Sequence, residues 1–273
     1  MAYDPVNGLM YVSVAGNYFV RVIDTTTNTI VDTIGVGSAP QQLAYDPDNG
    51  RMYVPNYNGH TVSVIDTTSK SVIATIPVFD KPSHIEYDPV NKHMYVVILS
   101  HDFVSVIDTA TNTIIDGIAV EDKLQKLAYN SINQNMYASN FLDDTISVID
   151  TSSRTVTATI AAGDGPIGMG FDPVNENMYV ANRIGNTLDV IDTSTLTIID
   201  SISGTSFVHT VEYDPVNQRM YVAGYYNNIV TVVQIDIPEP KGKNNPCDAL
   251  ETVSEKGNGK KNGLEKAKSN NDC

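Results

Sequence analysis

Residues 40–76 read PQQLAYDPDNGRMYVPNYNGHTVSVIDTTSKSVIATI, and this stretch decides the fold. It contains four short β-rich runs, at 42–45, 51–55, 61–65 and 71–76. Polar and apolar residues alternate along the third run, as they do in a half-buried strand. Asp, Pro, Asn and Gly stand between the runs, and tight turns favour these residues. The stretch therefore predicts four short antiparallel strands.

The same pattern returns six times along the chain, at a spacing that is almost always 42 residues. No window before the C-terminal tail has the apolar spacing of a helix, and four strands in this length are typical of one β-propeller blade. We predict an all-β propeller of six four-stranded blades over residues 1–237, followed by a Lys-rich tail over 238–273. The repeat is marked by Met10, Met52, Met94, Met136, Met178 and Met220, which we expect to pack in the core.

The most regular blades carry a Tyr-Val-x-Asn motif before a run that ends in Val-Ile-Asp-Thr. The motif occurs at 53–56 and 179–182, with a variant at 137–140, and a Val-Gly-x-x-Pro element occurs at 36–40. These residues resemble the YVTN family of β-propeller repeats, which is related to the repeats of archaeal surface-layer proteins. The resemblance covers about residues 3–236 and implies the propeller fold. It implies little about activity, because the shared residues are turns and core.

The two ends of the repeat region do not fit a complete ring. Met1 lies in register with core positions of the innermost strand, so we expect the first blade to lack about half of that strand. Residues 234–236 complete a third strand, and Pro238 and Pro240 then interrupt the expected fourth strand. Either the protein is a six-bladed ring with incomplete first and last blades, or it is part of a longer, for example seven-bladed, propeller. We favour the second alternative.

Composition restricts the partners and the compartment. The net charge of −15 repels phosphate backbones, so we predict no nucleic-acid partner. We also predict no transmembrane segment, and the chain as given shows no signal peptide. Two short helices, from 248–255 and 264–268, would bring Cys247 and Cys273 together as a disulfide that staples the tail. The alternative is a disordered tail with two free thiols. A disulfide favours an extracellular or cell-surface location.

Residues that break the repeat are the candidates for function. The innermost strands of the third and sixth blades carry a histidine near a glutamate, where the other blades have small residues. In a six-bladed ring these two blades are opposite, so the side chains would face each other across the mouth of the channel and supply metal ligands or an acid–base pair. The alternative, which we favour, is a polar lining of a water-filled channel. We therefore predict no metal, no cofactor and no catalytic residue, and the candidate binding residues are His84, Glu86, Lys126, His209 and Glu212.

The loops between the second and third strands also vary from blade to blade. In propellers these loops share a face with the loops that precede the innermost strands, and this face usually binds. Aromatic, Asn and Asp side chains suit a protein or glycan surface, although they also occur in ordinary loops. The candidate residues on this rim are Tyr57, Phe141, Arg183, Tyr225 and Tyr226.

These observations favour a non-catalytic, secreted or cell-surface propeller that binds a protein, a glycan or the cell envelope. Two alternatives remain. In the first, the protein is an enzyme or a metal-binding propeller whose site lies at the channel mouth, by analogy with lyase- or lactonase-type propellers. The propeller would also suit a domain of a redox protein, although the chain has no Cys-x-x-Cys-His motif for haem attachment.

Overall fold

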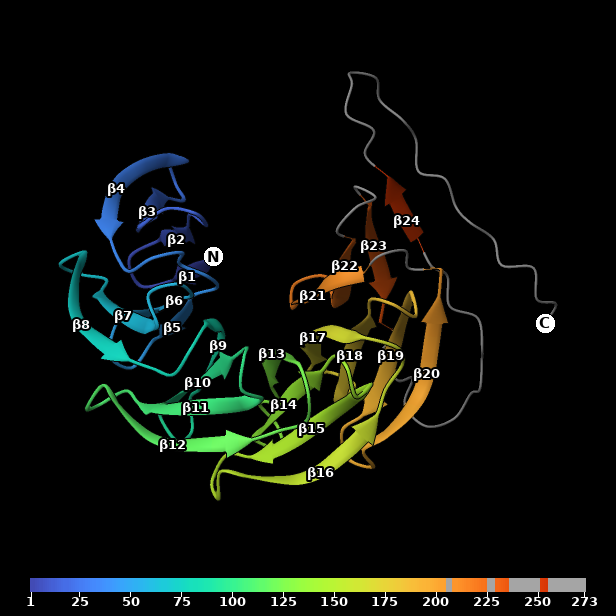
Figure 1. Cartoon of the computed structure of the whole chain (residues 1–273). Helices are drawn as coiled ribbons and strands as arrows, with labels where there is room; N and C mark the ends of the chain where they lie inside the picture. Colours follow the sequence, from blue (N-terminus) through green and yellow to red (C-terminus); the bar gives the residue numbers. More distant parts are fainter. Residues whose placement is uncertain (205–207, 225–228, 236–250, 255–273) are drawn as a thin grey trace. The chain divides into compact units, whose positions relative to one another are not determined.

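The computed structural model describes residues 1–204, 208–224, 229–235 and 251–254, and all regular structure in these ranges is β (Figure 1). The strands form six antiparallel sheets of four, each with its strands in sequence order. The predicted six-bladed β-propeller fold is therefore confirmed. The chain divides into two compact units. The first holds blades 1 to 3 and most of blade 4, and the second holds blades 5 and 6 with the short segments 130–133 and 144–146.

The strands follow the 42-residue repeat closely. Blades 1 to 3 consist of β1 (Ala2–Asp4), β2 (Leu9–Ser13), β3 (Phe19–Asp24) and β4 (Thr29–Gly35); β5 (Ala44–Asp46), β6 (Arg51–Asn56), β7 (Thr61–Asp66) and β8 (Ser71–Pro77); and β9 (Pro82–Asp88), β10 (His93–Ile98), β11 (Phe103–Asp108) and β12 (Thr113–Ala119). Blades 4 to 6 consist of β13 (Leu124–Tyr129), β14 (Asn135–Asn140), β15 (Thr145–Asp150) and β16 (Thr155–Ala161); β17 (Pro166–Asp172), β18 (Asn177–Asn182), β19 (Thr187–Asp192) and β20 (Thr197–Ser203); and β21 (Val208–Asp214), β22 (Arg219–Gly224), β23 (Ile229–Gln234) and β24 (Glu251–Ser254).

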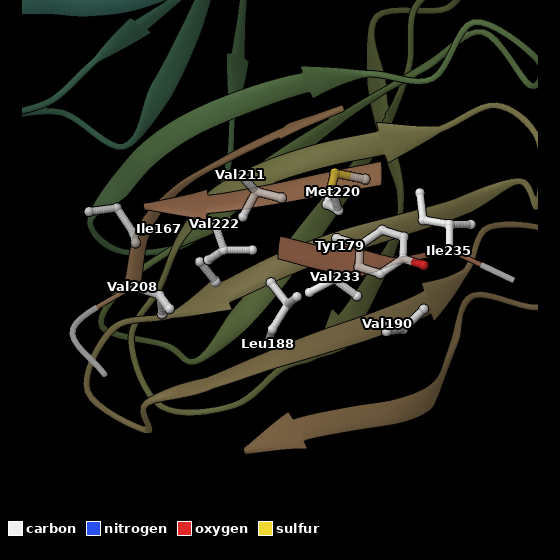
Figure 2. Packing of buried hydrophobic residues seen from close by; sticks show 11 residues of the cluster. Ile167, Tyr179, Leu188, Val190, Val208, Val211, Met220, Val222, Val233 and Ile235 are labelled. Carbon is white, nitrogen blue, oxygen red and sulfur yellow. The ribbon is translucent and has the colours of Figure 1, made fainter. Parts of the chain in front are cut away.

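The hydrophobic cores lie between neighbouring blades. One core joins Tyr53 and Val64 of blade 2 to Ile85 and Met94 of blade 3, and another joins blades 5 and 6 (Figure 2). Five of the six repeat methionines are fully buried, and Met10 is half-buried. Burial of a side chain of this size contributes about 1.5–3 kcal/mol. The prediction that these methionines pack in the core is confirmed.

The Asp-Pro-x-Asn turn fastens blades 1, 2 and 3 each to the blade that follows. In blade 2, Asp46 accepts hydrogen bonds from the backbone N–H of Asp48 (3.0 Å) and from the side-chain amide of Asn49 (2.8 Å). Asn49 also donates to the hydroxyl of Thr109 in blade 3, and the Tyr53 hydroxyl donates to the backbone carbonyl of Thr109. The same bonds recur at Asp4, Asn7 and Thr67, and at Asp88, Asn91 and Thr151.

The last blade differs from the prediction. Glu251–Ser254 forms β24, which pairs with β23 from Ile229↔Ser254 to Val232↔Glu251. The expected helix over 248–255 is therefore wrong in its described part, because the backbone of these residues completes the open edge of β23 instead of bonding within a helix. The expectation of an incomplete last blade is wrong for the same reason. Cys247 and Cys273 lie outside the described residues.

Blade 1 also has four strands, although its innermost strand is short. β1 pairs with β2 over three residue pairs, from Ala2↔Tyr11 to Asp4↔Leu9. β5 of blade 2 is equally short, although the chain there is continuous on both sides. A short innermost strand therefore does not prevent a blade from forming. That the propeller belongs to a longer, seven-bladed protein stays a prediction.

Candidate functional site

The two sets of loops that were predicted to share a face are hydrogen-bonded to each other. We call the loop before each innermost strand the between-blade loop. The backbone N–H of Lys123 donates to Asp102 (2.8 Å), and that of Gly165 donates to Asp144 (2.8 Å). Both aspartates end a loop between second and third strands and have positive φ angles. Each such bond satisfies a backbone donor on the next between-blade loop, so the loops form one connected rim within each unit.

Three predicted rim residues occupy equivalent places on this face. Tyr57, Phe141 and Arg183 each follow the second strand of a blade directly. Their backbone N–H groups donate to the between-blade loops, at the carbonyls of Ala39, Lys123 and Gly165. All three side chains are half-buried. That they bind a partner stays a prediction, and Tyr225 and Tyr226 lie outside the described residues.

Blade 3 carries an aromatic cluster on this face that the sequence reasoning missed. The rings of Phe79 and His101 have their centroids 4.7 Å apart, and those of Phe79 and Phe103 are 5.6 Å apart, both edge to face. Phe79 is 58% exposed. A signal was present in the sequence, because Phe79 stands where the Val-Gly-x-x-Pro element has its glycine, Gly37.

Polar side chains surround the aromatic cluster. The carboxylate of Asp80 lies 2.9 Å from Nδ1 of His60 and accepts a hydrogen bond from the Ser100 hydroxyl (3.0 Å). The Lys81 backbone N–H also approaches Nδ1 of His60, at 3.3 Å. The Lys81 hydrogen bond uses the Nδ1 lone pair of the neutral imidazole, and the contact with Asp80 is an ion pair only when the ring is protonated. The Ser100 hydrogen bond orients the Asp80 carboxylate beside the exposed ring of Phe79.

The predicted innermost-strand residues are distributed between the two units. His84 and Glu86 on β9 and Lys126 on β13 belong to the first unit, and His209 and Glu212 on β21 belong to the second. That the two glutamates face each other across a channel stays a prediction. Within β21, Nδ1 of His209 lies 3.2 Å from the Thr210 hydroxyl.

His84 is chemically the most perturbed of these residues. Its side chain is 5% exposed, and neither its Nδ1 nor the hydroxyl of Ser83 has a hydrogen-bond partner among the described residues. Burial, and after it the positive charges of Lys126 and the amino terminus, lowers the pKa of His84 from 6.5 to about 3. At neutral pH the imidazole is therefore uncharged and a weak base.

Metal ligands are not gathered at any place in the described ranges. No three His, Cys, Asp or Glu side chains there are arranged to hold an ion. The carboxylates of the Asp-Pro-x-Asn turns accept hydrogen bonds from their own turn residues, as at Asp46 and Asn49. The turn interpretation of this motif is therefore confirmed.

Glycines allow the innermost strands of blades 5 and 6 to approach closely. A Cβ atom on Gly168 would lie 2.5 Å from the backbone oxygen of His209, and one on Gly170 would lie 3.0 Å from Val211. The small residues that the sequence shows in this blade are therefore required by the contact between β17 and β21. The second unit has a close-packed inner edge at this point.

Comparisons with known proteins agree on the fold. A family described as YNCE-like beta-propeller matches residues 118–244. No curated protein matches the sequence significantly. Two solved structures with the same fold are hydrazine synthase from Kuenenia stuttgartiensis (TM-score 0.59, 18% identity, 86% of this chain and 95% of that chain) and a functionally unknown protein from Desulfotomaculum acetoxidans (TM-score 0.74, 17% identity, 84% and 76%). At these identities the likeness shows the fold alone.

The described part of the chain contains no helical segment that would span a bilayer.

Proposed function

We propose that the protein is a non-catalytic binding module, secreted or attached to the cell surface, and that its loop rim binds a protein or glycan of the cell envelope. The observation that carries the proposal is the aromatic cluster of Phe79, His101 and Phe103 on the rim, in which Phe79 and His101 are exposed. Exposed aromatic groups beside polar side chains are typical of recognition surfaces. The sequence resemblance to YVTN and surface-layer repeats supports the same location.

The distribution of variation also supports a binding role. Turns, interblade bonds and cores repeat from blade to blade, whereas the rim loops differ in each blade. Loops on a rigid scaffold are where binding residues concentrate. At the innermost strands, the buried and uncharged His84 is poorly suited to acid–base chemistry at neutral pH.

The proposal is tested by sedimentation of the full chain with an insoluble cell-envelope preparation of the native organism. One preparation is intact and another is treated with protease, so that protein and glycan partners are distinguished. We expect the chain to sediment with the envelope, and the Tyr57→Ala, Phe141→Ala double variant to sediment less. Thr68→Ala, in an exposed turn after the third strand of blade 2, is the control. A chain that stays in the supernatant with both preparations would overturn the proposal.

A further inference from the structure

Blades 2 and 5 show which residues are sufficient for the between-blade loop to fold. In blade 2, the Asn56 amide donates to the Thr61 hydroxyl at 3.0 Å, beneath Gly37. A Cβ atom on Gly37 would lie 2.6 Å from the Asn56 side chain, so glycine is the residue that fits there. Blade 5 has the same arrangement, with Gly163, Asn182 and Thr187. A Gly-Asn-Thr set is thus sufficient to close this corner of a blade.

Blade 3 replaces all three members of the set. Phe79, Ile98 and Phe103 stand at the glycine, asparagine and threonine positions. Ile98 is fully buried and Phe103 packs against the core between blades 2 and 3, so these two side chains have a structural role. Phe79 is 58% exposed, and the equivalent corner forms with glycine in two other blades. Folding does not account for a large ring at this surface position.

The three rings of the cluster pack against one another and enclose no space for a ligand. The ring centroids of Phe79, His101 and Phe103 are 4.7, 5.6 and 6.3 Å apart, with interplanar angles of 64–80°. At these distances the rings contact one another edge to face and leave no room for a group between them. A ligand therefore meets the outer side of the cluster, where Phe79 is exposed.

The polar neighbours add directional hydrogen bonds. Asp80 accepts a hydrogen bond from Ser100 and lies 2.9 Å from Nδ1 of His60, and its side chain remains 34% exposed. A carboxylate offers about four lone-pair sites, so two contacts leave it able to accept more hydrogen bonds. Hydroxyl groups are good donors for this purpose, since O–H···O⁻ bonds are short and strong. His101 is exposed beside the same ring.

We propose that the rim of blade 3 is a binding site for a neutral saccharide. The apolar face of a sugar ring would stack on Phe79, and its hydroxyl groups would donate to the carboxylate of Asp80. The net charge of −15 disfavours an acidic saccharide. A cationic peptide would suit Asp80 but would favour the open aromatic cage that this cluster lacks. The inference rests on the proposed function and names the ligand class of its rim.

The test uses the full chain and isothermal titration with neutral tetrasaccharides built from glucose, mannose or N-acetylglucosamine. Tetra-arginine is included as a cationic probe. We expect at least one tetrasaccharide to bind, and Phe79→Gly to weaken its affinity by about tenfold or more, as loss of an aromatic anchor does. Asp80→Asn should also weaken it. Phe79→Gly introduces the residue that blades 2 and 5 have, so it should fold, which circular dichroism verifies. Val90→Ser, exposed in the turn at the other end of β9, should bind as the unchanged protein does.

The outcomes separate this inference from the proposed function. Saccharide binding that Phe79→Gly leaves unchanged would place the site elsewhere and overturn the inference. If tetra-arginine is the only probe that binds, and Phe79→Gly abolishes this binding, the site binds a cationic peptide and the saccharide inference is overturned. Sedimentation with the envelope without binding of any tetrasaccharide would overturn the inference and leave the proposed function standing.

Discussion

The guanidinium Nε of Arg154 in blade 4 lies 2.8 Å from the carboxylate of Asp116 in blade 3. Asp116 and Arg154 are 38 residues apart. Two repeat units earlier in the sequence, the equivalent positions are again an acid and a cation, Asp32 in blade 1 and Lys70 in blade 2. In two other pairs the later position is uncharged and the earlier one is alanine, namely Ala74 with Asn112 and Ala158 with Leu196. In these four pairs, charge at one position accompanies opposite charge at the other, as a direct contact between the side chains would favour.

This ion pair should contribute little to stability. About a third of each side chain is exposed, and exposed pairs contribute about 0.2–1 kcal/mol. We expect a double-mutant cycle with Asp116→Ala and Arg154→Ala, measured by urea unfolding, to give a coupling in this range that decreases in 1 M salt. Arg154, and then the Gly117 backbone N–H, holds the pKa of Asp116 below 3.8. The coupling should therefore be full above about pH 4 and disappear as the pH falls through the lowered pKa. A coupling that persists at pH 2 would contradict this account.

Gly163→Ala should destabilise the protein. The new Cβ would lie 2.5 Å from the side-chain amide of Asn182, and such overpacking costs about 1–3 kcal/mol. Gly35→Ala is a matched control, because no heavy atom lies within 4 Å of its Cβ position. Thermal unfolding should show a lower Tm for the first variant and not for the second. Equal Tm values would show that Asn182 moves aside without cost.

Thr151→Val should weaken the contact between blades 3 and 4. The Thr151 hydroxyl accepts from the Asn91 amide (2.9 Å) and donates to the Gln134 carbonyl (2.8 Å), and the residue is 1% exposed. Leaving these buried partners unsatisfied costs about 1–3 kcal/mol. Thr25→Val, at the same place in blade 1 but exposed, should cost less. Urea unfolding checks both, and equal losses would contradict an interblade role for the hydroxyl.

His84 should make folding sensitive to acid. Its pKa is 6.5 when unperturbed and about 3 in the fold, so between these values the unfolded chain binds the extra proton. The free energy of unfolding should therefore fall by about 1.4 kcal/mol per pH unit as the pH drops below 6.5, through this residue alone. His84→Gln should remove that part of the slope in urea titrations from pH 7 to pH 4. Parallel curves for the two proteins would refute the assignment.

Repeated residues made the scaffold predictable. Tyr53, Asn49 and Thr109 each recur at the 42-residue spacing, and the strands and the buried methionines follow the pattern that the sequence shows. β24 was not predictable in the same way, because no repeat motif marks residues 251–254. Its pairing depends on the unpaired edge of β23, which is a property of the folded blade.

The candidate site was predictable only in part. Tyr57, Phe141 and Arg183 were placed on the rim from loop position alone, and the backbone bonds of these loops agree with that placement. The cluster around Phe79 was missed, since Phe79 stands more than twenty residues before His101 and Phe103 in the sequence. The sequence also does not show that Phe79 is exposed, because a phenylalanine in a strand-rich sequence is expected in the core.

By itself, the order of residues determined the blade, because turn chemistry and period-2 alternation act over a few neighbouring residues and recur at each repeat. The folded chain alone decided which side chains meet between blades, such as Arg154 with Asp116, and that Phe79 lies at the surface while Ile98 does not. These contacts join residues that are distant in sequence, and their energies arise from burial and geometry that exist only after the sheets have packed.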